Sequence, residues 1–184
     1  MMETTGDPTD TLPPAVYARR CVEAAVLRRA APESPDGAFF RRRAGCFVSI
    51  KRFGDLRGCI GTLTAVEADL ADEIVRNAIA AAFHDPRFGP IQPRELAELS
   101  YSVDVLAASE PCSESDLDPR VYGVIVSSGA RRGVLLPDLA GVETAVQQVT
   151  IALQKAGIRP DDPFSLERFR VERYPEVRGP SHGE

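Results

Sequence analysis

The residues best suited to chemistry lie in one short run, Leu56-Arg57-Gly58-Cys59-Ile60-Gly61-Thr62. A cysteine thiolate is a nucleophile, and a neighbouring cation favours the thiolate form. Side chains alternate along a strand, so Arg57, Cys59 and Gly61 are predicted to share one face. Two glycines inside a strand cost stability and usually mark the close approach of another group. The run therefore predicts a thiol beside a cation, on a strand against which something else packs.

The surroundings of Cys59 depend on how this run pairs with the preceding strand, residues 45–52. A loop at Phe53–Asp55 pairs Arg52 with Leu56 and places Ser49 opposite Cys59. This register separates a polar, basic face from an apolar face, and so it is the prediction. The polar face holds Phe47, Ser49, Lys51, Arg57, Cys59 and Gly61, and the apolar face Cys46, Val48, Ile50, Leu56 and Ile60. A two-residue turn at Gly54-Asp55 would mix both kinds of side chain on each face.

Two interpretations of Cys59 stay open at this point. A free cysteine is most often a small buried hydrophobic residue. Against burial stand the cation of Arg57, a second cation at Lys51 and the empty volume at Gly61. The other cysteines lack such surroundings and are predicted to be packing or incidental residues: Cys21, Cys46 and Cys112.

A second group of charged and aromatic residues is the run Phe83-His84-Asp85-Pro86-Arg87-Phe88. Asp85 and Arg87 either fix the loop after a helix or, in the functional alternative, present Arg87 as a rigid donor to a carboxylate or phosphate. His84 is a candidate base for Cys59, which requires the two side chains to lie within hydrogen-bond reach. A single histidine at a helix end is more often exposed and without a role.

Periodicity predicts the elements that must position these residues. Helices are expected from Pro14 to about Arg29, from Asp69 as N-cap to Asp85, and over Val142–Ala156 with Gly157 as C-cap. Strands are expected over 45–52, 56–63, 99–105, 121–126, 133–136 and 169–173. Because the strands arrive as hairpins between helices, we predict an α+β fold with a mostly antiparallel sheet flanked by helices.

Composition excludes several classes of function. The chain has 184 residues, with 22 Lys and Arg against 27 Asp and Glu, and its net charge of −5 has the wrong sign for a nucleic-acid partner. Four widely spaced cysteines and two histidines offer no zinc-finger or iron–sulfur pattern. No apolar run approaches a membrane span, and the start lacks the pattern of a signal peptide. We expect a cytoplasmic protein with no cofactor, no metal, no nucleic-acid partner and no membrane partner.

Three motifs together resemble those of the AMMECR domain family, of the AmmeMemoRadiSam system protein A type. They are the run at 56–62, the Ala-Ala-Phe-His-Asp-Pro-Arg-Phe run at 81–88, and Arg132-Gly133 followed by Leu135-Leu136-Pro137. The resemblance covers about residues 15–175 and implies an α+β fold with a larger antiparallel-sheet subdomain, a smaller lobe, and the glycine-cysteine motif near the cleft between them. It also implies association with a Memo-like protein and a radical S-adenosylmethionine (SAM) enzyme. It brings no established reaction.

The resemblance also assigns roles to residues and bounds to the domain. Cys59 and Arg57 become candidate catalytic residues, and the candidate substrate-binding residues are Gly58, Gly61, Thr62, Asp85 and Arg87. Residues 13–176 are expected to form one domain with two subdomains. Residues 1–12 are expected to be loosely ordered or disordered, and residues 177–184 to be a flexible tail.

Two functions remain open. In the first, the protein is an enzyme or enzyme-system component acting on a small molecule, with Cys59 as nucleophile or covalent carrier. Arg57 then holds the thiolate or an anionic substrate, and backbone N–H groups near Gly58–Gly61 stabilise negative charge. In the second, the protein is a non-catalytic ligand-binding or adaptor subunit in which Cys59 is structural. The glycines then let a partner strand or a small molecule approach closely.

Overall fold

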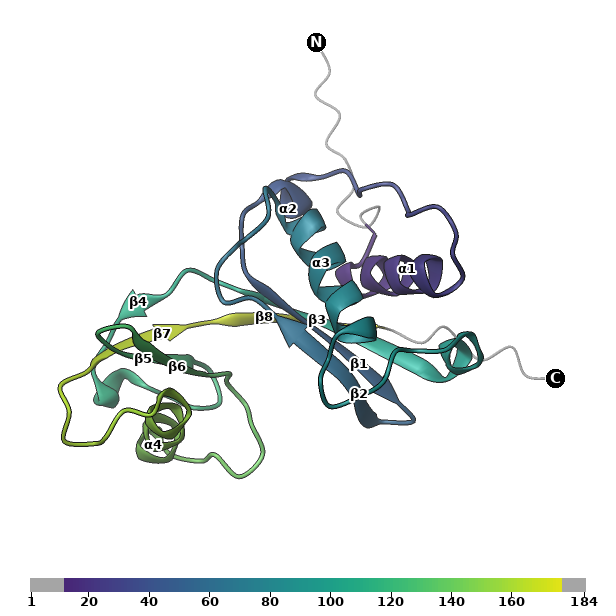
Figure 1. Cartoon of the computed structure of the whole chain (residues 1–184). Coiled ribbons are helices and arrows are strands. Elements are labelled where there is room, and N and C mark those ends of the chain that lie inside the picture. Colours follow the sequence, from purple (N-terminus) through teal and green to yellow (C-terminus); the bar gives the residue numbers. More distant parts are fainter. Residues whose placement is uncertain (1–11, 177–184) are drawn as a thin grey trace, which may run out of the picture. The chain divides into compact units, whose positions relative to one another are not determined.

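The computed structural model describes residues 12–176 (Figure 1). They form two compact units, unit 2 over Leu106–Glu172 and unit 1 from the remaining described residues on either side of it. Each unit carries its own four-stranded sheet and at least one helix. The predicted α+β class with antiparallel strands is therefore confirmed. The expectations for residues 1–11 and 177–184 fall outside the described residues.

Unit 1 is a sheet with helices packed on one face. Its sheet has the strand order β2-β1-β3-β8, so β2 is an edge strand. Along the chain its elements are α1 (Pro14–Val26), α2 (Ala38–Arg41), β1 (Cys46–Arg52), β2 (Asp55–Gly61), α3 (Leu70–Phe83), the 3₁₀ helix η1 (Pro93–Glu98), β3 (Leu99–Leu106) and β8 (Val171–Pro175). The short α2 lies between the first predicted helix and the predicted strand over 45–52.

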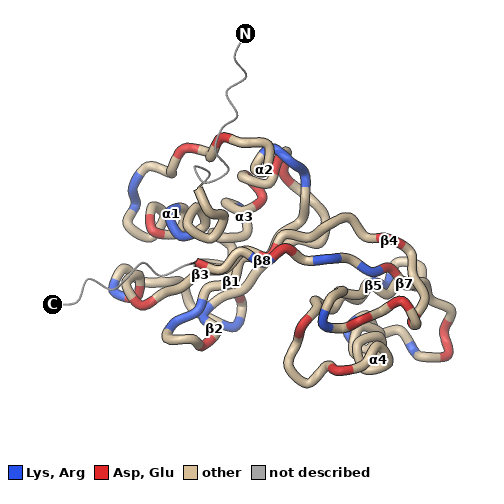
Figure 2. Tube along the Cα trace, turned by 180° about the vertical axis from the view of Figure 1, so that it is seen from behind, with Lys and Arg blue, Asp and Glu red and all other residues tan. Residues whose placement is uncertain are grey.

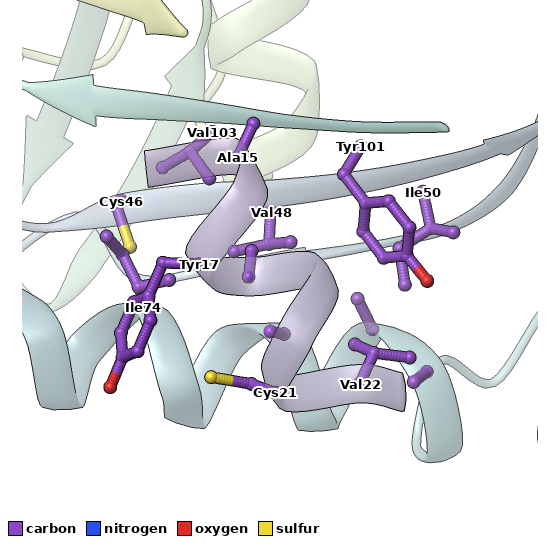
Figure 3. Packing of buried hydrophobic residues seen from close by; sticks show 14 of the residues in the cluster. Ala15, Tyr17, Cys21, Val22, Cys46, Val48, Ile50, Ile74, Tyr101 and Val103 are labelled. Atoms are coloured by element: carbon purple, nitrogen blue, oxygen red, sulfur yellow. The ribbon is translucent and has the colours of Figure 1, made fainter. Parts of the chain in front are cut away.

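The core of unit 1 forms where α1 and α3 meet the sheet. Figure 3 shows Val22 and Ile74 of the helices in one cluster with Val48 and Val103 of the strands, and all four side chains are buried. The apolar face predicted for β1 is thus confirmed, since Cys46, Val48 and Ile50 are all fully buried. Burial of such side chains removes apolar surface from water and supplies most of the stability of this unit.

The ends of the predicted helices have local causes. Asp69 caps α3 as predicted, because its side chain accepts a hydrogen bond from the Asp72 N–H at 3.0 Å. Gly157 ends α4 (Ala145–Ala156) in the left-handed conformation, also as predicted. α1 ends at Val26 rather than Arg29, because Arg28 adopts a positive φ of 52°. α4 begins three residues later than predicted, because Thr144 is its N-cap.

The hairpin of β1 and β2 corrects one prediction and confirms another. The turn is Phe53-Gly54, with both φ angles positive, so Arg52 pairs with Asp55 and not with Leu56. Such a turn fits the right-handed twist of a hairpin. A bulge then places one extra residue on β2, which restores the predicted pairing of Ser49 with Cys59. Leu56 is consequently 41% exposed, and the prediction that it faces the core is wrong.

Both glycines of the β2 run are required by close packing within unit 1. A Cβ on Gly58 would overlap the carbonyl oxygen of Ala81, so the backbone of α3 lies directly against β2. A Cβ on Gly61 would overlap the ring of Phe47, its cross-strand neighbour. The group predicted to pack against this strand is therefore a helix of the same unit.

Unit 2 repeats this construction on a smaller scale. Its strands are β4 (Glu110–Pro111), β5 (Gly123–Ser128), β6 (Arg131–Leu135) and β7 (Ser165–Phe169), in the order β4-β7-β5-β6. A short 3₁₀ helix, η2 (Glu114–Asp116), precedes β5, and α4 packs on the sheet through an apolar cluster of its own. A Cβ on Gly133 would overlap the carbonyl oxygen of Ala152 in α4. The single last strand predicted over 169–173 is divided between β7 and β8.

Two properties of the described residues bear on possible partners: the distribution of charge and the length and hydropathy of the helices. Lys and Arg lie interspersed with Asp and Glu through both units (Figure 2). Among the helices of residues 12–176, none has the length and apolar character needed to cross a membrane.

We predict that Gly58→Ala destabilises the protein by about 1–3 kcal/mol, because the new methyl group must push β2 away from the α3 backbone. Urea unfolding followed by far-UV circular dichroism measures the change. Gly89→Ala is the matched control, since a Cβ there meets nothing within 4 Å. Equal stability of the two variants would contradict the packing described for Gly58.

Candidate functional site

Cys59 lies on the edge strand β2, and its side chain faces Ser49 on β1. The Ser49 hydroxyl donates a hydrogen bond to the Cys59 Sγ, with 3.2 Å between the two atoms. The Cys59 peptide groups point away from β1, so the pair belongs to the closer, non-hydrogen-bonded type. Both side chains are half-buried, which leaves the thiol partly accessible.

Asp85 and Arg87 hold the Cys59 peptide at the free edge of β2. The Cys59 N–H donates to Asp85 Oδ2 at 2.9 Å, and Arg87 Nη2 donates to the Cys59 carbonyl at 3.2 Å. Arg87 also donates to both carboxylate oxygens of Asp85, through Nε at 3.0 Å and Nη2 at 2.8 Å. The two side chains therefore occupy the positions that a neighbouring strand would use. We call this arrangement the Asp85–Arg87 clamp.

The charge of Asp85 matters to the clamp, because this carboxylate is buried and both of its oxygens accept hydrogen bonds. Its side chain is 1% exposed, while that of Arg87 is 53% exposed. The hydrogen bonds from Arg87 hold the pKa of Asp85 well below its usual range, and the N–H of Cys59 acts in the same direction. Asp85 is accordingly an ionised acceptor, and its oxygens are committed to protein donors.

Arg57, predicted to stand beside the thiol, is bound elsewhere. Its guanidinium donates to both oxygens of Glu95 at 2.8 and 3.1 Å and to the Gly89 carbonyl at 3.0 Å. None of these hydrogen bonds involves Cys59. Arg57 is the extra residue of the bulge, which breaks the alternation that predicted a shared face. Its side chain ties β2 to η1 and to the loop before it.

Thr62 belongs to a buried network between β2 and α3. Its hydroxyl donates to Glu73 and accepts from Asn77 Nδ2, while Asn77 also donates to the Cys46 carbonyl. Glu73 is fully buried and accepts two further N–H groups, those of Val66 and Glu67. The network holds the segment between β2 and α3 in place, and all of its hydrogen bonds join residues of unit 1.

Sequence reasoning missed Glu73, Asn77 and Glu95. All three are buried polar residues with several hydrogen bonds. A signal was present for the first two, because they are polar residues four apart on the apolar stripe of α3 that contains Leu70, Ile74 and Ala78. Buried polar groups in such positions need partners, which here lie at the start of β1 and in the segment that follows β2.

His84 does not meet Cys59. It is the C-cap of α3, it is exposed, and no hydrogen bond joins it to the thiol in the part of the chain that the structure describes. The structure thus brings Cys59, Asp85 and Arg87 together and leaves His84 outside this group. Within residues 12–176 no group of three or more His, Cys, Asp or Glu side chains is arranged to hold a metal ion.

The four cysteines have different surroundings. Cys21 and Cys46 are buried, and burial raises the pKa of Cys21 to about 11 and that of Cys46 to about 12. Cys59 and Cys112 are half-buried, and for Cys112 burial also raises the pKa of the thiol. Cys112 in unit 2 is therefore the natural internal reference for the reactivity of Cys59.

We predict that Asp85→Asn destabilises the protein by about 2–4 kcal/mol at pH 7, because four N–H donors lose a charged acceptor. Asp85 has a lower pKa in the folded state than in the unfolded state. Its contribution is therefore complete above the unfolded pKa of about 4 and is lost as the pH falls towards the folded pKa. Urea unfolding at pH 7 and pH 3 should show a smaller difference from wild type at pH 3.

Asp36→Asn is the control for this change, because Asp36 is exposed. It should alter the free energy of unfolding by less than about 0.5 kcal/mol. A loss at Asp85→Asn no larger than this would argue against the clamp as a source of stability.

Comparison with known proteins identifies relatives of this chain. The model of the AMMECR1 family matches residues 15–178. A protein of Thermotoga maritima is 52% identical over 145 residues, which cover 77% of this chain and 83% of that protein. A protein of Clostridium acetobutylicum is 48% identical over 134 residues, and the match covers 73% of this chain but only 29% of that longer protein. The crystal structure of an uncharacterized protein from Pyrococcus horikoshii has a TM-score of 0.78 at 27% identity, with 91% and 92% of the two chains covered.

Proposed function

The chain belongs to the AMMECR1 family, and we propose that Cys59 is the reactive thiol of a small-molecule site on the sheet of unit 1. One observation carries the proposal: a partly accessible thiol belongs to a residue whose main-chain N–H and main-chain carbonyl are both held by hydrogen bonds. Fixing the backbone of a reactive residue through a supporting layer of side chains is how sites are preorganised. Ser49 adds a hydrogen bond that orients the sulfur.

The step available to such a thiol is attack on an electrophilic carbon. The S–H proton passes to solvent, the sulfur electron pair forms the S–C bond, and the leaving group departs with the electron pair of the bond that breaks. Among the described residues no imidazole or carboxylate is hydrogen-bonded to the Cys59 Sγ. The site therefore fits a covalent carrier that accepts a group better than a cysteine–histidine hydrolase.

Residue roles follow from this proposal. Cys59 is the nucleophile, and Asp85 and Arg87 are positioning residues because they act through its backbone. Arg57, Gly58 and Thr62 keep β2 against α3 and η1. A carrier also needs proteins that load and unload it, and we propose the Memo-like protein and the radical SAM enzyme implied by the motifs for these roles.

A second function has one observation in its favour. The Asp85–Arg87 clamp binds main-chain atoms of Cys59, contacts that any residue except proline could make at this position. A non-catalytic ligand-binding or adaptor subunit, with a structural Cys59, would use the same clamp. The reactivity of the thiol separates the two functions.

We predict that iodoacetamide labels Cys59 of the native protein first, followed by Cys112, with Cys21 and Cys46 labelled only after unfolding. Timed labelling at pH 8, read by peptide mass spectrometry, measures all four thiols at once. Cys59→Ser provides the control for assigning the label. Labelling of Cys59 as slow as that of Cys46 would favour the structural role.

The partnership is tested by size-exclusion chromatography of the chain mixed with the Memo-like protein and the radical SAM enzyme of the same genome. We expect co-elution with at least one of them, unaffected by Cys59→Ser. Separate elution of all three proteins would argue against a stable assembly.

A further inference from the structure

We propose that the ligand of the Cys59 site is a small molecule carrying a carboxylate, and that the ammonium of Lys51 and a row of serine hydroxyls hold this group. The inference rests on the proposed function, because it names the class of molecule that the thiol would meet. It is carried by the arrangement of side chains on the face of the unit 1 sheet that Cys59 shares with Ser49.

The strand register aligns these side chains in two rows. Ser49 on β1 pairs with Cys59 on β2 and with Ser102 on β3. Two residues further along β1, Lys51 pairs with Ser100 on β3. Paired residues share a face and residues two apart in a strand share a face, so all five side chains project from the same side. The sulfur thus continues a line of hydroxyl groups.

Four of these five residues line a pocket of about 170 Å³, and Cys59 lies beside it. Ser49, Lys51, Ser100 and Ser102 contribute to its wall, together with Pro175 and Glu176 at the end of β8. Every residue of this group belongs to unit 1. Ser49 lines the pocket and also bonds to the sulfur, so a ligand in the pocket is one side chain away from Cys59.

The charged side chains at the pocket indicate the charge of the ligand. Lys51 is exposed and forms no ion pair within residues 12–176, whereas the carboxylate of Glu176 is bonded to Arg19 at 2.8 Å. Asp104 on β3, two residues beyond Ser102, is bonded to Arg173 at 2.8 and 3.1 Å. Among residues 12–176, the unpaired charge at the pocket is therefore the positive charge of Lys51.

One ammonium surrounded by neutral hydroxyls matches one negative charge. Hydroxyls donate to the oxygens of an anion, and the flexible stem of lysine lets its charge lean towards them. A phosphate dianion is usually met by several cations or by a series of backbone N–H groups. The composition of this pocket favours a monoanionic carboxylate, with the reactive carbon directed towards the sulfur.

The test compares two alkylating agents that deliver similar groups to sulfur and differ in charge. Iodoacetate carries a carboxylate and iodoacetamide is neutral; with each, the thiolate forms an S–C bond and iodide leaves with the electron pair. We expect the rate ratio of iodoacetate to iodoacetamide at low ionic strength to be higher at Cys59 than at Cys112. Lys51→Gln should lower the ratio at Cys59 about fivefold, the size of effect expected for one charge near a surface site.

The control is Lys155→Gln, which removes the only other lysine of the chain, on α4 in unit 2. It should leave the ratio at Cys59 unchanged. If Cys59 reacts with neither agent, the proposed reactive thiol fails. If it reacts with both and Lys51→Gln leaves the ratio unchanged, the reactive thiol stands and the carboxylate site is overturned.

Discussion

The site depends on one constraint: Asp85 and Arg87 form hydrogen bonds to the main-chain N–H and carbonyl of Cys59. An edge strand exposes N–H and carbonyl groups that invite another strand. In β2 the clamp satisfies these groups at Cys59 with side chains that come directly after α3. The same contacts therefore end the sheet, attach the end of the helix to it and set the orientation of the thiol.

The clamp works because α3 is already in contact with β2. The missing side chain of Gly58 allows the Ala81 carbonyl to approach the strand, which brings the residues after Phe83 to the level of Cys59. Gly133 and the Ala152 carbonyl make the equivalent approach between β6 and α4 in unit 2. In both units an arginine precedes the glycine, and the helix packs through its backbone rather than through a layer of large side chains.

Local sequence patterns predicted the features that depend on residues close in sequence, such as helix caps and strand faces. They missed the contacts between residues far apart in sequence. The Asp69 and Gly157 caps, the apolar face of β1 and the pairing of Ser49 with Cys59 follow from side-chain periods and capping chemistry. Strict alternation failed at Arg57, since the turn at Phe53-Gly54 requires a bulge to recover the register. The partners of Asp85 and Arg87 are main-chain atoms 26 and 28 residues away, and no side-chain pattern encodes them.

The β2 run is distinctive because most of its residues serve the fold, each through a different contact. Arg57 binds Glu95, Gly58 admits α3, Gly61 lies under the ring of Phe47, and Thr62 bonds to Glu73 and Asn77. Cys59 differs, because its main-chain groups make the structural contacts, whereas its side chain makes one hydrogen bond among the described residues, to Ser49. A residue held so firmly through its main chain can keep its position while its side chain reacts. Most residues of the run at 56–62 thus hold the strand in place, and the thiol of Cys59 is the one group that the run presents for chemistry.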